Sequence, residues 1–297
     1  MTAGGTESLV TAPPLALPSR RALVTRRALR HPGALAGGLL LVFLFGLAFA
    51  GPWLAPWSWQ ATDFAAFRSP PSAQHWFGTT PSGRDVYALT LRGMRKSLLI
   101  GLGVAVLSTG LAAFAGMVAG YFGGWADRVL MWWVDLLLVL PAFLVVAVLT
   151  PAVGRHWPVL VLLLAAFLWM VTARVVRGMT ASLRRREYVL AARYAGVSAA
   201  RILLRHVLPN LASLLIVDAT LNVSVAIISE SALSYFGFGV QPPDSSLGTV
   251  IAAGAGQATT YPWLFVPAAV LLVLTVLAVN LLGDALRDAF DPSKESR

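Results

Sequence analysis

Cysteine is absent from this chain of 297 residues, which excludes disulfides, thiolate metal ligands and cysteine nucleophiles. Charge is scarce as well. Charged residues make up 12% of the sequence, against roughly 25% in ordinary soluble domains. Hydrophobic residues make up 57%. This composition excludes most soluble folds and predicts an integral membrane protein.

Motifs for catalysis and nucleotide binding are also missing. The histidines are scattered over different predicted loops: His31, His75, His156 and His206. That scatter does not suit metal ligation. The only lysines are Lys96 and Lys294, and neither lies in a Gly-x-x-x-x-Gly-Lys-[Ser/Thr] phosphate loop. The sequence therefore predicts no catalytic residue, no metal site and no bound cofactor in this chain.

Six largely apolar runs approach the about 20 residues needed to cross a bilayer core of about 30 Å. They cover residues 34–51, 97–122, 129–150, 158–173, 211–238 and 263–283. The first run imitates a cleavage site at Ala48, Phe49 and Ala50, but its length and preceding tail favour an uncleaved anchor. We therefore predict an all-α membrane protein with six transmembrane helices.

The distribution of basic residues predicts the orientation. If the spans alternate and the N-terminus lies inside, 17 of the 23 Lys and Arg residues lie on the inner side, which favours two cytoplasmic termini. The net charge of +10 then reflects membrane topology, and no nucleic-acid partner is predicted.

The same reasoning divides the chain into segments. A partly disordered, basic cytoplasmic tail covers 1–33 and the first transmembrane helix 34–51. An external segment along the membrane face covers 52–96. A five-helix core covers 97–284 and includes a cytoplasmic loop at 177–209, and a cytoplasmic tail covers 285–297.

The loop at 177–209 is the most informative segment. Nothing breaks a helix over residues 187–195, and Gly196 can supply the left-handed residue that ends it. Ser198 can cap a second helix running to His206, before Pro209 interrupts the chain. The loop is therefore predicted to form two short helices with a sharp turn between them.

The small side chains of Ala191 and Ala192 would let another surface approach this helix closely, with the charges of Glu187 and Arg193 at its rim. Docking into a groove of a partner protein is one interpretation. An amphipathic helix lying on anionic membrane lipid is the other. Composition alone favours neither.

The pattern Ala191-Ala192-x-x-x-Gly196, followed by Leu208-Pro209, resembles the EAA loop of ABC importer permeases. In that family a short coupling helix sits in a cleft of the ATPase subunit. The family's Glu before the two alanines is Leu190 here, and Glu187 lies about one helical turn earlier. The resemblance implies that ATPase docking and coupling rest on Ala191, Ala192, Gly196, Leu208 and Pro209. The charges of Glu187 and Arg193 at the rim of the helix complete the predicted coupling residues.

Other motifs resemble the C-type permeases of dipeptide and oligopeptide importers. They are Arg27-Ala-Leu-Arg-His-Pro32, His75-Trp-Phe-Gly-Thr79, Gly83-Arg84-Asp85, Ser229-Glu-Ser-Ala-Leu-Ser-Tyr-Phe-Gly-Phe-Gly239 and Gln241-Pro-Pro243. They occur in the family's order and span nearly the whole chain beyond its first 20 or so residues.

The resemblance implies a non-catalytic, pore-forming subunit of an ATP-driven importer of di- or oligopeptides in the bacterial inner membrane. It also implies a homologous permease as heterodimer partner and an external substrate-binding protein or lipoprotein. Two ATPase domains would bind the ATP and Mg²⁺. Similar permeases serve nickel, glutathione or other small solutes, so those substrates remain alternatives.

Polar residues inside the spans suggest the substrate pathway. Asp218 and Asn222 share a helix face that continues to Glu230. They could line a pathway for peptide backbone and termini, or form interhelical hydrogen bonds. Two functions of other classes remain open at this point: an ion-gradient-driven transporter working through Asp135, Asp218 and Glu230, and a membrane scaffold or sensor.

Overall fold

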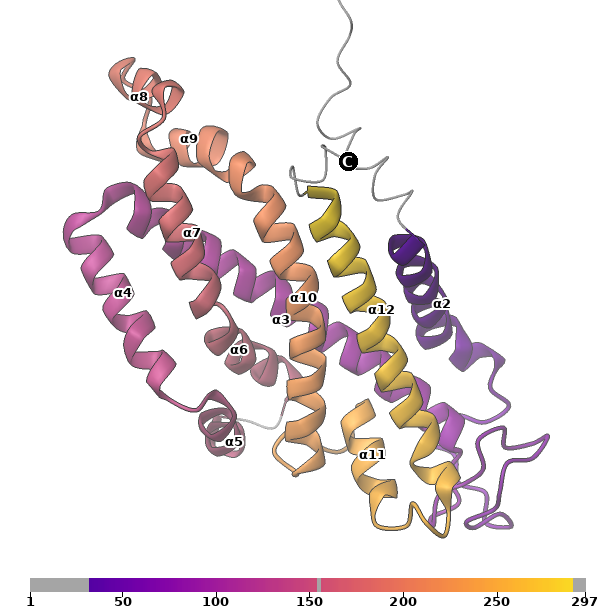
Figure 1. The fold of residues 1–297 in the computed structure, drawn as a ribbon. Coiled ribbons are helices and arrows are strands. Elements are labelled where there is room, and N and C mark those ends of the chain that lie inside the picture. Colours follow the sequence, from indigo (N-terminus) through magenta and orange to yellow (C-terminus); the bar gives the residue numbers. More distant parts are fainter. Residues whose placement is uncertain (1–31, 154–155, 291–297) are drawn as a thin grey trace, which may run out of the picture.

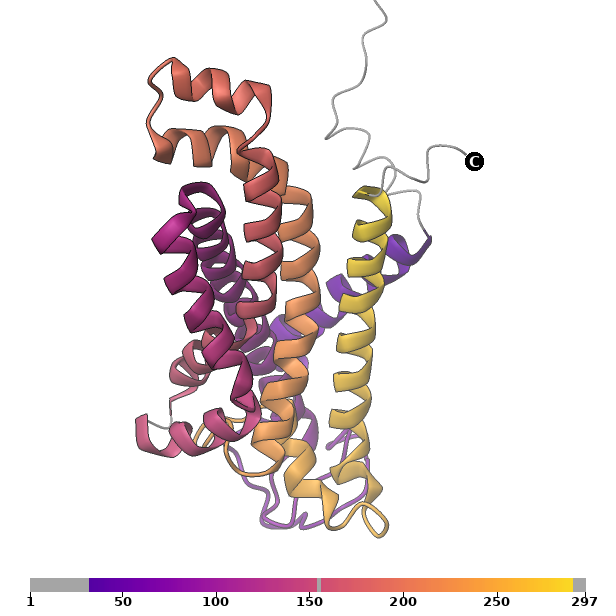
Figure 2. The ribbon, with the colours of Figure 1, turned by 60° about the vertical axis from the view of Figure 1, so that its left-hand side comes forward.

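The computed structural model describes residues 32–153 and 156–290, and these residues are mainly helical, with an irregular segment over 55–85 (Figures 1 and 2). Most of the predicted N-terminal tail and residues 291–297 lie outside the described residues. Helices long and apolar enough to cross a membrane are α2 (Pro32–Leu54), α3 (Val86–Phe122), the continuous helix Ala199–Tyr235 that contains α10 (Leu208–Tyr235), and α12 (Val266–Phe290). Two bent helix pairs raise the number of candidate spans from 4 to 6, which confirms the all-helical membrane fold.

The two bent pairs cover the spans predicted over 129–150 and 158–173, and each is divided into two helices at a bend. The first pair, α4 (Gly124–Val139) and α5 (Ala142–Val153), bends by 89°. Its cause is Pro141, because a proline disfavours the helical conformation of the preceding residue, and Leu140 has a ψ of 130°. The second pair, α6 (Trp157–Leu168) and α7 (Met170–Leu183), bends by 47°.

Helix α3 begins at Val86, well before the run predicted from 97. Its first turn is capped by Asp85, whose side chain accepts a hydrogen bond of 2.8 Å from the backbone N–H of Ala88. Charged residues in its early turns hid this start from a search for apolar runs. With 37 residues the helix is about 55 Å long, and it runs obliquely behind α7, α10 and α12 (Figure 1).

Close approach between α3 and α7 depends on two glycines. A Cβ on Gly116 would lie 2.6 Å from the carbonyl oxygen of Ala173, and one on Gly120 would lie 2.4 Å from that of Arg177. Small residues at such crossings let membrane helices pack backbone to backbone. At the other edge of the molecule α2 packs against α12, with Leu44 and Ala278 in one buried cluster.

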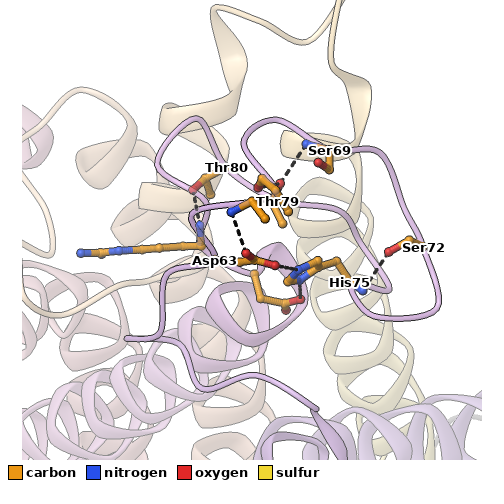
Figure 3. A network of polar contacts seen from close by, with 10 residues as sticks. Asp63, Ser69, Ser72, His75, Thr79 and Thr80 are labelled. Carbon is orange, nitrogen blue, oxygen red and sulfur yellow. Dashed lines mark hydrogen bonds and ion pairs between the residues drawn. The ribbon is translucent and has the colours of Figure 1, made fainter.

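The segment between α2 and α3 folds around a buried histidine (Figure 3). His75 contacts Asp85 through Nδ1 at 2.9 Å and Asp63 through Nε2 at 3.4 Å. The Trp57 ring stacks on the imidazole at 5.0 Å. The backbone N–H of Ala65 donates a hydrogen bond to the Asp63 carboxylate and lowers the pKa of this carboxyl below its ordinary 3.8. Desolvation opposes this shift, and the adjacent His75 adds to it.

Candidate coupling loop and pathway residues

Helix α8 (Glu187–Tyr194) protrudes beyond the ends of the spans, next to α9 (Ala199–Ile202) (Figure 1). It follows α7 after a tight turn at residues 184–186. The guanidinium of Arg184 donates a 2.8 Å hydrogen bond to the carbonyl of Tyr121, which ties the base of the protrusion to the end of α3.

The end of α8 has the predicted geometry. Gly196 has a φ of 76°, a left-handed conformation that glycine adopts without steric cost. The N–H of Gly196 donates to the carbonyl of Arg193, and that of Val197 donates to the carbonyl of Ala192, both at 3.1 Å. These bonds satisfy carbonyls that the helix end leaves free. Ser198 precedes α9 as predicted, but its side chain makes no capping hydrogen bond.

The prediction that Pro209 interrupts the chain is wrong. A π-helical segment, Leu203–Val207, joins α9 to α10, and a continuous helix runs over Ala199–Tyr235. Proline is tolerated in the first turn of a helix segment, and Pro209 lies there in α10. In the π turn directly before it, the backbone N–H of Leu208 donates to the carbonyl of Leu203.

The inner face of α8 packs against the core of the helix bundle through Val189, which is 1% exposed. Val189 belongs to a buried cluster drawn from α3, α7, α9 and the start of α10, which also contains Met117, Val176, Ile202, Leu203, Val207 and Leu211. Ala192 and Leu208 pack against the same cluster. Val189 therefore belongs to a cluster that three spanning helices, α3, α7 and α10, also supply.

The outer face of α8 is exposed and contains Glu187, Ala191 and Tyr194 at positions i, i+4 and i+7. The two alanines thus face different ways, with Ala191 outward and Ala192 inward. Sequence reasoning missed Tyr194, whose side chain is 87% exposed, although its helical spacing from Ala191 was visible. Exposed aromatic side chains frequently anchor protein interfaces.

A groove of about 650 Å³ lies beside the start of α8. It is lined by Leu183, Arg185, Arg186, Glu187, Tyr188 and Asn210. Arg193 is exposed on α8 itself, and Pro209 is exposed in the first turn of α10. The structure therefore gathers the predicted coupling residues at one end of the molecule, but on two faces: one outward and one toward the core.

Asp218 joins three helices. Its carboxylate accepts hydrogen bonds from Thr109 of α3 at 3.2 Å and from Thr172 of α7 at 2.6 Å. Asn222, one turn along α10, donates a third at 3.0 Å. Interhelical bonds of this kind hold membrane bundles together. A role for Asp218 and Asn222 in the substrate pathway stays a prediction.

Glu230 lies in a separate and fully buried network. It accepts hydrogen bonds from Ser97 of α3 at 2.9 Å and from Ser234 at 2.6 Å. The Ser97 hydroxyl in turn accepts from the backbone N–H of Leu247, the first residue of α11 (Leu247–Ala255), at 3.1 Å. Glu230 thus connects α3, α10 and α11, and its predicted contact with substrate also stays a prediction.

Two ion pairs between α4 and α7 had not been foreseen. Asp135 pairs with Arg174, and Asp127 pairs with Arg177. From the sequence, these two arginines were used only to predict which side of the membrane they lie on. Their partners lie about 40 to 50 residues earlier in the chain, and no local spacing relates them.

The bent spans, the protruding loop and the buried polar networks define a multi-pass membrane protein. A family model described as the binding-protein-dependent transport system inner membrane component matches residues 112–296. A second, the N-terminal transmembrane domain of oligopeptide transport permease C, matches residues 19–71. The chain belongs to the family of binding-protein-dependent transport system inner membrane components.

The curated relatives cover nearly the whole chain. The oligopeptide transport system permease protein OppC of Mycobacterium tuberculosis is 55% identical over 94% of this chain and 96% of its own length. A putative peptide permease of Brucella suis is 40% identical over 91% and 90%. OppC of Haemophilus influenzae is 37% identical over 90% and 86%.

Family membership confirms the resemblance to importer permeases. The chain is a non-catalytic, multi-pass protein of the inner membrane, and its system includes ATPase and binding-protein partners. The ion-gradient and scaffold alternatives do not fit a binding-protein-dependent system.

Proposed function

We propose that this chain translocates di- or oligopeptides into the cytoplasm as one half of a permease heterodimer, driven by separate ATPase subunits that dock on α8. The observation that carries the docking proposal is the two-faced geometry of α8. Val189 fixes one face to the core cluster, and the opposite face carries Glu187, Ala191 and Tyr194 in the open. The peptide substrate is proposed from the names of the relatives.

In this proposal Ala191 allows the backbone of α8 to lie close to the wall of an ATPase cleft, while Glu187 and Arg193 form polar contacts at its rim. The other four residues act differently: Ala192 and Leu208 support α8 from the core side, Gly196 ends the helix, and Pro209 lies in the first turn of α10. Leu190 replaces the family's Glu, and Glu187 supplies a carboxylate one turn earlier on the exposed face.

The coupling follows from differential binding. ATP and Mg²⁺ bound by the two ATPases close them, and the closed pair must bind the outward-open permease more tightly than the inward-open one. Movement of α8 then reaches α3, α7 and α10 through the cluster around Val189. Asp218, Asn222 and Glu230 are proposed to lie along or beside the pathway that these helices open.

The orientation belongs to the same proposal. Both termini and α8 would face the cytoplasm, and the segment around His75 would face an external substrate-binding protein or lipoprotein. The arginines of the α8 loop support this orientation, because basic residues favour the cytoplasmic side. Membrane lipid surrounds the outer helices, and no nucleic acid is involved.

Reconstitution in proteoliposomes tests the function. The chain with its permease and ATPase partners should take up a labelled oligopeptide when ATP and the binding protein are supplied, and should not do so with ADP. Uptake driven by an ion gradient through this chain alone would contradict the proposal. Competition with unlabelled peptides, glutathione and nickel salts identifies the substrate, and displacement by glutathione or nickel alone would replace the peptide assignment.

A further inference from the structure

Helix α4 is held to α7 by charge more than by packing. Within α4 the only buried residue is Val134. Arg177 binds Asp127 in a bidentate manner, with Nη2 donating to Oδ2 at 2.5 Å and Nε donating to Oδ1. Further along the same seam, Nη2 of Arg174 donates to Oδ1 of Asp135.

The second pair lies at mid-depth in the bent spans. Asp135 is about 16 Å along α4 from its start at Gly124, and Arg174 is about 14 Å along α7 from its end at Leu183, at 1.5 Å per residue. Both helix ends lie near α8 (Figure 1). Each distance is about half of a bilayer core of about 30 Å.

This mid-depth pair is open to its surroundings. The side chains of Arg174 and Asp135 are 50% and 61% exposed, whereas those of Arg177 and Asp127 are 44% and 20% exposed, so the two pairs differ mainly at the carboxylate. Charged groups at this depth are costly in lipid and face protein or a water-filled cavity. The seam between α4 and α7 therefore faces away from lipid at the level of Asp135.

The charges of α4 also occupy one edge of the helix. Asp127, Arg128 and Asp135 fall within an arc of about 100° at 100° per residue. Trp133 points to the opposite side, and it is one of the large exposed apolar residues that α4 presents elsewhere. The apolar face suits lipid or a neighbouring protein, and the charged edge suits protein or water.

We propose that the Asp135–Arg174 pair lines the translocation pathway and binds the charged groups of the passing peptide, a carboxylate on Arg174 and an ammonium on Asp135. The inference rests on the proposed transport of peptides. A solvated ion pair contributes little to stability and can exchange partners with a zwitterion. The bidentate Arg177–Asp127 pair is less exposed and stays closed, so α4 remains attached to α7 while the peptide passes.

The absence of native cysteine provides a direct test. Asp135→Cys gives this chain one thiol, to be probed in the complete complex with a cationic, membrane-impermeant methanethiosulfonate. We expect rapid labelling, and at least threefold slower labelling during transport of saturating oligopeptide with ATP. Val42→Cys on α2, 72% exposed on an apolar helix, is the matched control and should stay unlabelled. No labelling of Asp135→Cys, or labelling that peptide leaves unchanged, overturns the inference.

Arg174→Gln provides a second readout. Relative to the wild type, we expect the KM for a free oligopeptide to rise at least fivefold, while that for its C-terminally amidated form changes less than twofold. An equal effect on both peptides overturns the inference. So does loss of the partner permease on purification of Arg174→Gln, because the pair would then serve assembly. If the wild-type complex takes up no peptide at all, the proposed function itself fails.

Discussion

The two ends of this molecule are built in opposite ways. At the α8 end, a short helix rests on the core through one buried residue, Val189, and turns its other face outward. At the opposite end, Glu230 and its serine partners are buried, and the segment before α3 closes around His75. The first end is suited to receive a partner and move with it, and the second to keep its shape while the helices move.

Charge has a different use at each end. Near α8 the arginines are largely exposed, as at a surface that meets another protein. At the other end two cations are engaged within the chain: Lys96 pairs with Asp244 at 3.0 Å, and the guanidinium of Arg92 lies 3.6 Å from the centre of the Trp59 ring. Cation–π contacts of this kind fix cationic side chains against aromatic surfaces.

The largest expected effect comes from filling the open face of α8. Ala191→Arg should lower peptide-stimulated ATPase activity and peptide uptake at least tenfold, because a long charged side chain prevents close approach of the ATPase. The spans should remain folded. The measurement is ATPase activity and uptake of the reconstituted complex, with Ala200→Arg on the neighbouring helix α9 as the control. Normal coupling in Ala191→Arg would show that the ATPase does not dock on the exposed face of α8.

The opposite end should respond in stability instead. Glu230→Ala leaves the hydroxyls of Ser97 and Ser234 without their buried acceptor, and an unsatisfied buried group costs about 1–3 kcal/mol. We expect a lower melting temperature of the purified complex, with the ratio of ATP hydrolysed to peptide transported unchanged. Glu230→Gln keeps an acceptor oxygen and should lose less. If Glu230→Ala kept a normal melting temperature but changed the ratio of ATP hydrolysed to peptide transported, this end would act in coupling and not in stability.

Sequence reasoning succeeded where the signal is local. Apolar runs located α2, α10 and α12. Gly196 marked the end of α8, because the positive φ that ends a helix depends on the residue at that one position. The π turn before Pro209 was missed because proline alone does not reveal how the preceding turn adapts. The bend at Pro141 was missed because the apolar run over 129–150 was interpreted as one span, although the sequence contains the proline.

The side-chain networks could not be predicted, because they depend on which helices meet. Asp218 was identified as polar, but its partners Thr109 and Thr172 lie 109 and 46 residues away in the chain. The opposite orientations of Ala191 and Ala192 likewise depend on the packing of Val189, which places one side of α8 on the core.

A smaller effect is expected from stiffening the turn after α8. Gly196→Ala places a Cβ at a φ of 76°, and the left-handed conformation costs a residue other than glycine about 1–2 kcal/mol. A Cβ there would meet no neighbouring atom, so the cost is conformational and local to the protrusion. We expect weaker ATPase association, measured by titration of the complex. Gly178→Ala, in open space on α7, should leave association unchanged.

The smallest effect is expected from acid at the opposite end. The pKa of Asp63 is below its ordinary 3.8, so its contribution to folding is complete above that pH and is lost as the pH falls through the lower folded value. Residues 55–85 should therefore lose protection from hydrogen exchange as the pH falls below 3.8. Asp63→Asn should already be less protected at neutral pH and should lack the acid-dependent part of the loss. Equal acid sensitivity in both proteins would assign the loss to another carboxyl and leave Asp63 without a part in holding this end rigid.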